Sequence, residues 1–257
     1  MIASLGMYDP PPLQAANDRF WALIRDGLRA RGMTAPDQLT RGDGAYWLAW
    51  QSPDLVLSQT CGYPFRTRLH DRVTLVGTPD FGVEGCPPGY YRSVFVARAT
   101  DPRDQLSDYS GSRFAYNEDL SQSGWAAPQT HAARQGLHFP PALRSGGHRL
   151  SALAVAEGRA DLAAIDAVTW SLLQRHEEFA AALNVVGQTD PTPGLPYITR
   201  QGADADTLFD AVSVAIAALS DADRDLLHLR GLVRIPAAEY LAVPNPPAPG
   251  ALAVAIC

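Results

Sequence analysis

Apolar residues along this chain recur with two different periods. Between Leu13 and Arg31 they return every three or four residues, and Gly32 follows directly, which predicts an amphipathic helix that ends at a glycine. A similar spacing predicts a helix from Asp206 to Leu219. Short apolar runs bounded by Gly, Pro, Asn or Asp predict strands. The strands predicted in this way are residues 2–8, 54–60, 72–79, 90–98, 113–117, 160–166, 183–189 and 197–200.

Strands alternate with helices throughout the sequence. This alternation predicts an α/β protein with mainly parallel sheets. The character of the sequence changes at residues 99–102, Ala-Thr-Asp-Pro, and changes back after the strand at 197–200. We therefore expect a discontinuous first lobe, residues 1–96 plus 203–257, and an inserted second lobe, residues 97–202. A cleft between two lobes, beyond the carboxyl ends of the strands, is the usual place for a small ligand.

The composition is that of a folded protein without a basic surface. Of the 257 residues 46% are hydrophobic and 19% are charged, and the net charge is −6. All 21 residues counted as Lys or Arg are arginines. An acidic chain without basic clusters is not expected to bind nucleic acid. Without lysine there is neither a Walker-type phosphate loop nor a lysine Schiff base, and no Gly-x-Gly-x-x-Gly follows the first strand, so no cofactor is expected.

The cysteines Cys61, Cys86 and Cys257 show no spacing typical of a metal site. Cys61 and Cys86 both lie in turns rich in Gly and Pro. They are either a disulfide or two thiols, because sequence alone does not give connectivity. For a protein that works outside the cytoplasm we expect the disulfide, which would contribute roughly 3 kcal/mol by constraining the unfolded chain.

The hydropathy of the chain also bears on its location. No apolar run approaches the roughly 18 residues that a membrane-spanning helix needs. The first ten residues lack a basic segment, a long apolar segment and a cleavage site, so they are expected to form a strand rather than a signal peptide. The chain is then either cytoplasmic or the mature form of an exported protein.

A polar cluster precedes the helix predicted to run to Arg134. Residues 121–124, Ser-Gln-Ser-Gly, place two hydroxyls two positions apart and a glycine without a side chain beside the first backbone N–H groups. Serine at this position is a common N-cap. The same N–H groups, together with the helix dipole, also favour an anion. The cap and the anion site are compatible interpretations.

Two further polar residues stand at strand-to-helix junctions. His148 follows two glycines and can direct a ring N–H at an oxyanion, although a structural histidine is the commoner case. Asp166 ends a buried strand, so it is either the N-cap of the next helix or a partner for a ligand amine or hydroxyl. Ser121, His148 and Asp166 are the residue types of a catalytic triad, but no Gly-x-Ser-x-Gly motif accompanies them.

Four stretches of the chain carry a family resemblance. The run 87–128, with its Gly-Tyr, Asp-Pro and Ser-Gln-Ser-Gly, resembles the periplasmic phosphonate/phosphate-type solute-binding proteins of ABC transporters. The run 146–170, GGHRLSALAVAEGRADLAAIDAVTW, resembles the next block of that family. PDLVLSQTCGYP, residues 53–64, resembles its first-lobe cleft loop, and PTPGLPYITR, residues 191–200, its return strand. The resemblance extends from Ile2 to about Leu229.

This resemblance implies a monomeric two-lobe clamp of the type II periplasmic-binding fold, which captures a small oxyanion-bearing compound for an ABC transporter permease and performs no chemistry. It implies a periplasmic location. Ser121 to Ser123 would hold the anionic head, His148 would add a donor, and Asp166 would meet the polar tail of the ligand. Three tyrosines would line the first-lobe wall or the hinge. The implied ligand-binding residues are Tyr8, Tyr63, Tyr90, Ser121, Gln122, Ser123, Gly124, His148 and Asp166.

The sequence also departs from this family at two places. Residues 117–120, Asn-Glu-Asp-Leu, stand where the family has a shorter Asp-Pro-type turn, and Thr60-Cys61 stands where an aromatic residue is usual. Both departures concern which ligand is bound. An enzyme on the same fold, acting through Cys61 or His148, and a ligand sensor are the alternative functions.

Overall fold

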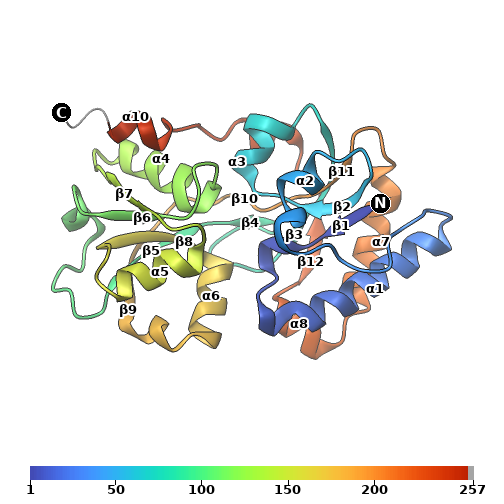
Figure 1. The fold of residues 1–257 in the computed structure, drawn as a ribbon, viewed down its shortest axis with the longest axis horizontal. Helices are drawn as coiled ribbons and strands as arrows, with labels where there is room; N and C mark the ends of the chain where they lie inside the picture. The colour runs from blue at the N-terminus through green and yellow to red at the C-terminus, as the bar shows by residue number, and fades with distance from the viewer. Residues whose placement is uncertain (254–257) are drawn as a thin grey trace. The chain divides into compact units, whose positions relative to one another are not determined.

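The polypeptide passes three times between two separately folded units (Figure 1). The structure, a computed structural model, describes residues 1–253. Unit 1 comprises Met1–Tyr90 and Pro193–Ala242, and unit 2 comprises Tyr91–Thr192 and, within the described part of the chain, residues 243–253. Two short strands, β4 (Tyr90–Tyr91) and β10 (Thr192–Pro193), pair with each other where the chain leaves and re-enters unit 1.

These boundaries differ from those expected from the sequence. Residues 91–96 belong to unit 2, because strand β5 (Ser93–Arg98) pairs with two strands of that unit. Residues 193–202 belong to unit 1, because strand β11 (Tyr197–Arg200) lies in the middle of its sheet. The last segment also belongs to unit 2 rather than to the first lobe. Hydrogen bonding to a sheet decides the unit of a strand, and the change in composition did not reveal it.

Unit 1 is built on a five-stranded sheet in the order β1-β2-β11-β3-β12. Its other strands are β1 (Ile2–Ser4), β2 (Leu55–Gln59), β3 (Val73–Asp80) and β12 (Gly231–Val233). Its α-helices are α1 (Gln14–Ala30), α2 (Trp47–Trp50), α3 (Gly62–Pro64), α7 (Ala205–Ala217), α8 (Asp221–Leu227) and α9 (Ala237–Leu241). Short 3₁₀ segments at Gly6–Tyr8, Pro11–Leu13 and Gly42–Ala45 and a π-helical segment at Phe65–Leu69 complete it.

Helices cover this sheet and bury its apolar side chains. Helix α7 packs against β3, β12 and α1, and the predicted periodicity of both long helices is confirmed. Gly77 of β3 has no room for a side chain, because Phe209 of α7 lies directly against it. Another part of the apolar core of this unit consists of the buried residues Ala49, Trp50, Leu55, Phe65, Leu69, Val73, Ile198 and Tyr240.

Unit 2 is built on a sheet in the order β7-β6-β8-β5-β9. Its other strands are β6 (Phe114–Tyr116), β7 (Pro141–Arg144), β8 (Leu162–Asp166) and β9 (Leu183–Gln188). Its α-helices are α4 (Ala127–Arg134), α5 (His148–Ala156), α6 (Ala167–His176) and α10 (Pro249–Ala253). A π-helical segment covers Gln122–Ala126, and 3₁₀ segments cover Leu106–Tyr109 and Glu178–Ala182. Helix α5 packs on β5, β6 and β8 over a buried apolar cluster.

The α/β class is confirmed, but the sheets are mixed rather than mainly parallel. In unit 1 only β1 and β2 pair in parallel, while β11 is antiparallel to both of its neighbours. In unit 2 the strand β6 is parallel to β7 and β8, whereas β5 is antiparallel to β8 and β9. The antiparallel strands β5 and β11 directly follow the points where the chain changes unit, so they do not belong to the strand–helix–strand repeats on which the prediction rested.

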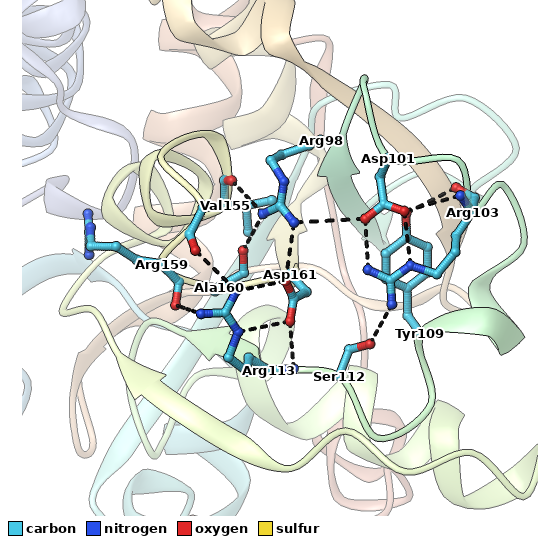
Figure 2. A network of polar contacts seen from close by, with 11 residues as sticks. Arg98, Asp101, Arg103, Tyr109, Ser112, Arg113, Val155, Arg159, Ala160 and Asp161 are labelled. Carbon is cyan, nitrogen blue, oxygen red and sulfur yellow. Dashed lines mark hydrogen bonds and ion pairs between the residues drawn. The ribbon is translucent and has the colours of Figure 1, made fainter.

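A network of arginine and aspartate side chains lies at one end of the three inner strands of the unit 2 sheet (Figure 2). Asp161 precedes β8 and accepts from Arg113, which precedes β6 (2.9 Å), and from Arg98 at the end of β5 (3.2 Å). The Arg103 guanidinium donates two hydrogen bonds, of 2.9 and 2.7 Å, to the Asp101 carboxylate, and these bonds lower the pKa of Asp101 to about 2. The network ties three strand ends together, and the opposite ends of β6 and β8 carry Asn117 and Asp166.

The expected disulfide between Cys61 and Cys86 is not formed. Cys61 is buried where β2 leads into α3. Cys86 lies in the loop between β3 and β4, and that loop folds back on Asp80, whose Oδ1 accepts from the N–H groups of Gly82 (2.9 Å) and Gly89 (3.4 Å). The third cysteine, Cys257, lies outside the described residues. Two cysteines in turns rich in Gly and Pro are therefore not sufficient to predict a disulfide.

None of the helices within residues 1–253 combines the length and the apolar character that a membrane span requires.

Candidate anion-binding site

The helix that follows β6 begins in the way that residues 121–124 predict. Ser121 is its N-cap, and the Ser121 Oγ accepts a hydrogen bond of 3.0 Å from the N–H of Gly124. The first turn is π-helical, because the N–H of Ala126 reaches back to the Ser121 carbonyl (2.9 Å). Such wide turns are frequent at functional sites. The helix then continues through α4 to Arg134.

His148 meets this helix start from another element. It is the first residue of α5, and its Nε2 lies 2.8 Å from the Oγ of Ser123. The backbone of Ser123 is anchored in turn, since the Ser93 hydroxyl donates to its carbonyl (2.8 Å). Ser123, on the helix after β6, and His148, on the helix after β7, are thus in direct contact, and Ser93 of β5 holds one of them in place.

Burial sets the charge of the histidine. Desolvation lowers the pKa of His148 to about 4, against the opposing effect of the Ala164 backbone. Its Nδ1 is enclosed, and no hydrogen bond of good geometry reaches it from the described residues. The ring is therefore neutral at pH 7, so a positively charged histidine does not provide the attraction for an anion. With a ring N–H facing the Ala164 carbonyl, Nε2 accepts from the Ser123 hydroxyl.

Glycine at position 124 is required by its surroundings. A Cβ atom added there would overlap the Asn117 Oδ1 and lie 3.3 Å from the Cε1 of His148. Residues 121–125 are buried, with Gln122 at 1% and Ser123 at 2% exposure. The start of this helix is therefore a crowded, largely dehydrated place lined by hydroxyl, amide and imidazole groups. An anion there would gain from undiminished electrostatic interactions with the N–H groups.

Asp166 serves as a helix cap. Its Oδ1 accepts from the N–H groups of Val168 (2.8 Å) and Thr169 (3.0 Å) at the start of α6. The side chain is buried, with 2% exposure. The capping interpretation of this residue is confirmed. His148 pairs with Ser123 rather than Ser121, so the structure does not assemble Ser121, His148 and Asp166 as a triad.

The three tyrosines of the sequence prediction belong to unit 1, whereas Ser121, His148 and Asp166 belong to unit 2. The ring of Tyr8 is buried and packs edge-on against Phe81, with 4.9 Å between centroids. The Arg66 guanidinium lies over the ring of Tyr63 at 4.6 Å. Tyr90 is partly exposed, and burial together with Glu239 raises its pKa. Their part in ligand binding remains a prediction.

The structure singles out two polar side chains in segments that the sequence analysis linked to the choice of ligand without assigning either residue a contact. Asn117 follows β6, and its enclosed Oδ1 receives no hydrogen bond within the described chain. Thr60 follows β2 in unit 1 and is fully buried, and its hydroxyl likewise lacks a partner among residues 1–253. Both residues stand directly after a buried strand, and this position in the sequence is the signal that could have identified them as candidate site residues. Residues 1–253 contain no cluster of three His, Cys, Asp or Glu side chains arranged to hold a metal.

Comparison with solved structures finds the same fold in several binding proteins. PhnD1 from Prochlorococcus marinus in complex with methylphosphonate is 15% identical, with a TM-score of 0.68 and coverage of 93% of this chain and 94% of that one. The binding component of an ABC phosphonate transporter from Pseudomonas aeruginosa is 16% identical, with a TM-score of 0.64 and coverage of 90% and 80%. A histidine kinase sensor domain with similarity to periplasmic binding proteins is 17% identical, with a TM-score of 0.61 and coverage of 91% and 98%.

The α/β chain described above thus has the two-lobe periplasmic-binding-protein-like fold. No curated protein sequence matches it significantly. The profile of the family described as "ABC transporter, phosphonate, periplasmic substrate-binding protein" matches residues 52–240, which is well over half of the sequence. The chain therefore belongs to the family of periplasmic phosphonate-binding proteins of ABC transporters.

Proposed function

We propose that this chain is a substrate-binding protein that captures a small oxyanion-bearing compound, of the phosphonate or phosphate type, and presents it to an ABC transporter permease. The observation that carries the proposal is the 2.8 Å contact between Ser123 Oγ and His148 Nε2 at a buried helix N-terminus. The family supports it, and so does the methylphosphonate bound by the related PhnD1.

The physics of the site suits an anion without a cationic side chain. The first N–H groups of a helix have no carbonyl partner within that helix, and the dipole adds partial positive charge there. Ser121 contributes a hydroxyl that rotates toward a ligand oxygen, and the Ser123 hydroxyl does so by exchanging its His148 acceptor for the ligand. Because His148 is neutral at pH 7, the helix start supplies the attraction and the histidine positions the Ser123 hydroxyl. An oxyanion taken out of water needs several such donors at once.

Calorimetry with the Ser123→Ala variant tests this proposal. A charge-assisted hydrogen bond contributes about 1.5–3 kcal/mol, so affinity for methylphosphonate or phosphate should fall roughly ten- to a hundredfold. Ser107→Ala is the matched control, because Ser107 is exposed in the same unit. Unchanged affinity of the Ser123→Ala variant, or no measurable binding of any oxyanion by the unmodified protein, would count against the proposal.

An enzymatic function is the alternative that the serine–histidine contact itself suggests. A hydroxyl 2.8 Å from an imidazole is the geometry of a nucleophile beside its base. However, burial disfavours the imidazolium that such a base must become, since the pKa of His148 is lowered to about 4. Phosphorus NMR decides between the two functions. After prolonged incubation a binding protein returns methylphosphonate and phosphate esters unchanged, and an enzyme does not.

A further inference from the structure

Asn117 is the residue that the proposed site leaves unexplained. It follows β6, and its backbone is fixed by neighbours, because its carbonyl accepts from the N–H of Gly146 (2.9 Å) and the preceding Tyr116 carbonyl accepts from Ser145 (2.8 Å). The side chain is therefore presented from a rigid position. Its Oδ1 is shielded from solvent and accepts no hydrogen bond from any described residue. An enclosed amide oxygen without a donor is costly unless something else supplies the proton.

This oxygen lies against the start of the helix that Ser121 caps. A Cβ on Gly124 would overlap the Asn117 Oδ1, and the same point is 3.3 Å from the ring of His148. Gly124 stands in the first turn of the helix, and its own N–H is already used by the Ser121 hydroxyl (3.0 Å). The amide oxygen, the imidazole and the helix start thus converge, and they come from three separate segments of unit 2.

The convergence places an acceptor among donors. Backbone N–H groups and hydroxyls favour ligand oxygens that carry negative charge. A tetrahedral oxyanion without any proton would direct an oxygen lone pair toward the Asn117 Oδ1, and the two oxygens would repel each other. An oxyanion that keeps one proton offers both kinds of group, with charged oxygens for the donors and one O–H for the amide oxygen.

We propose, on the basis of the function above, that Asn117 Oδ1 accepts the O–H of a monoprotonated tetrahedral oxyanion, so that the site prefers hydrogen phosphonates and hydrogen phosphate to sulfonates and sulfate. Asn117 is then a specificity-determining residue. A site built to hydrogen-bond a ligand O–H discriminates strongly against an analogue that lacks it, because its own polar group is left unpaired.

Methylphosphonate and methanesulfonate form a matched pair of probes. At pH 6 both carry one negative charge and have the same shape, but only methylphosphonate retains an O–H. We expect calorimetry to show at least tenfold tighter binding of methylphosphonate by the unmodified protein. In the Asn117→Ala variant, methylphosphonate should bind roughly ten- to a hundredfold more weakly, and methanesulfonate should bind as before. Asn184→Ala, at an exposed position on β9, is the control.

An Asn117→Asp variant separates an acceptor from a donor. A carboxylate keeps the shape and the acceptor but loses the amide N–H groups, so the preference for methylphosphonate should survive while both ligands bind more weakly. Two outcomes would overturn the inference. The first is loss of the preference for methylphosphonate in Asn117→Asp, which would show that Asn117 donates. The second is an unchanged ratio of the two affinities in Asn117→Ala, whether or not both ligands bind more weakly. If the unmodified protein binds neither probe, the proposed function itself fails.

Discussion

The two units contain one similar local feature with different chemistry. In unit 2 the buried strand β6 leads to a helix with a π-helical first turn at Gln122–Ala126. In unit 1 the buried strand β2 leads to the helix formed by α3 and Phe65–Leu69, whose second part is also π-helical. Ser121 caps the first helix with its hydroxyl, whereas Cys61 makes no side-chain cap to the second.

The surroundings of the two helix starts differ even more than their caps. Near Gly124 lie the Asn117 amide and the His148 ring. Near Gly62 the neighbours of an added Cβ would be Tyr240 Cδ1 (3.6 Å), the Pro193 carbonyl oxygen (3.8 Å) and Arg66 Nη1 (3.9 Å), all at ordinary contact distances. The backbone path after a buried strand is thus shared, and the neighbouring segments decide how closely other groups approach the helix start. Two pairs of substitutions and one change of pH test how the two units differ.

The largest effect is expected from alanine at the two glycines. Gly124→Ala forces the Asn117 side chain away from the helix start, so affinity for methylphosphonate should fall more than a hundredfold, and overpacking should cost about 1–3 kcal/mol of stability. Gly62→Ala meets only ordinary contacts and should change stability by less than about 1 kcal/mol. Calorimetry and urea unfolding measure both quantities. Similar behaviour of the two variants would remove the distinction between the helix starts.

An intermediate effect is expected from pH. The pKa of His148 is about 4 in the folded protein, below its ordinary value of 6.5, so acid favours the unfolded chain, which takes up the proton first. Stability from this group is complete above pH 6.5 and decreases as the pH falls toward 4, by about 3 kcal/mol in all.

The titration of the His148 ring can be followed by its Cε1–H chemical shift, and the stability by urea unfolding at pH 7 and pH 5. A His148→Gln variant should lose less stability between these two pH values than the unmodified protein. A ring that titrates near pH 6.5 would contradict the burial argument.

The smallest effect is expected from two N-cap serines with the same geometry. The Ser121 Oγ accepts from Gly124 at 3.0 Å, and the Ser220 Oγ accepts from Asp223 at 3.1 Å in unit 1. Replacing either with alanine should cost about 1 kcal/mol in urea unfolding. Only Ser121→Ala should also weaken oxyanion binding, by roughly tenfold. If Ser220→Ala weakens binding equally, the loss is one of general stability.

Features that depend on neighbouring residues were predictable from the sequence. The helix at Gln14–Ala30 and the capping by Ser121 and Asp166 follow from local periodicity and from the hydrogen bonds of a helix end, which involve only residues two or three positions away. The arrangement of β5 and β11 and the state of Cys61 and Cys86 depend on distant segments, and there the predictions needed correction.

The sequence by itself determined the α/β class, the family resemblance and the helix start capped by Ser121, because strand and helix periods and capping are local properties of the chain. Tertiary structure alone decided that His148 meets Ser123, that its burial keeps it neutral, and that the Asn117 oxygen enters the space beside Gly124. The physical reason is that desolvation and side-chain convergence arise only when β6, α5 and the helix after Ser121 pack together, and no short-range pattern records that packing.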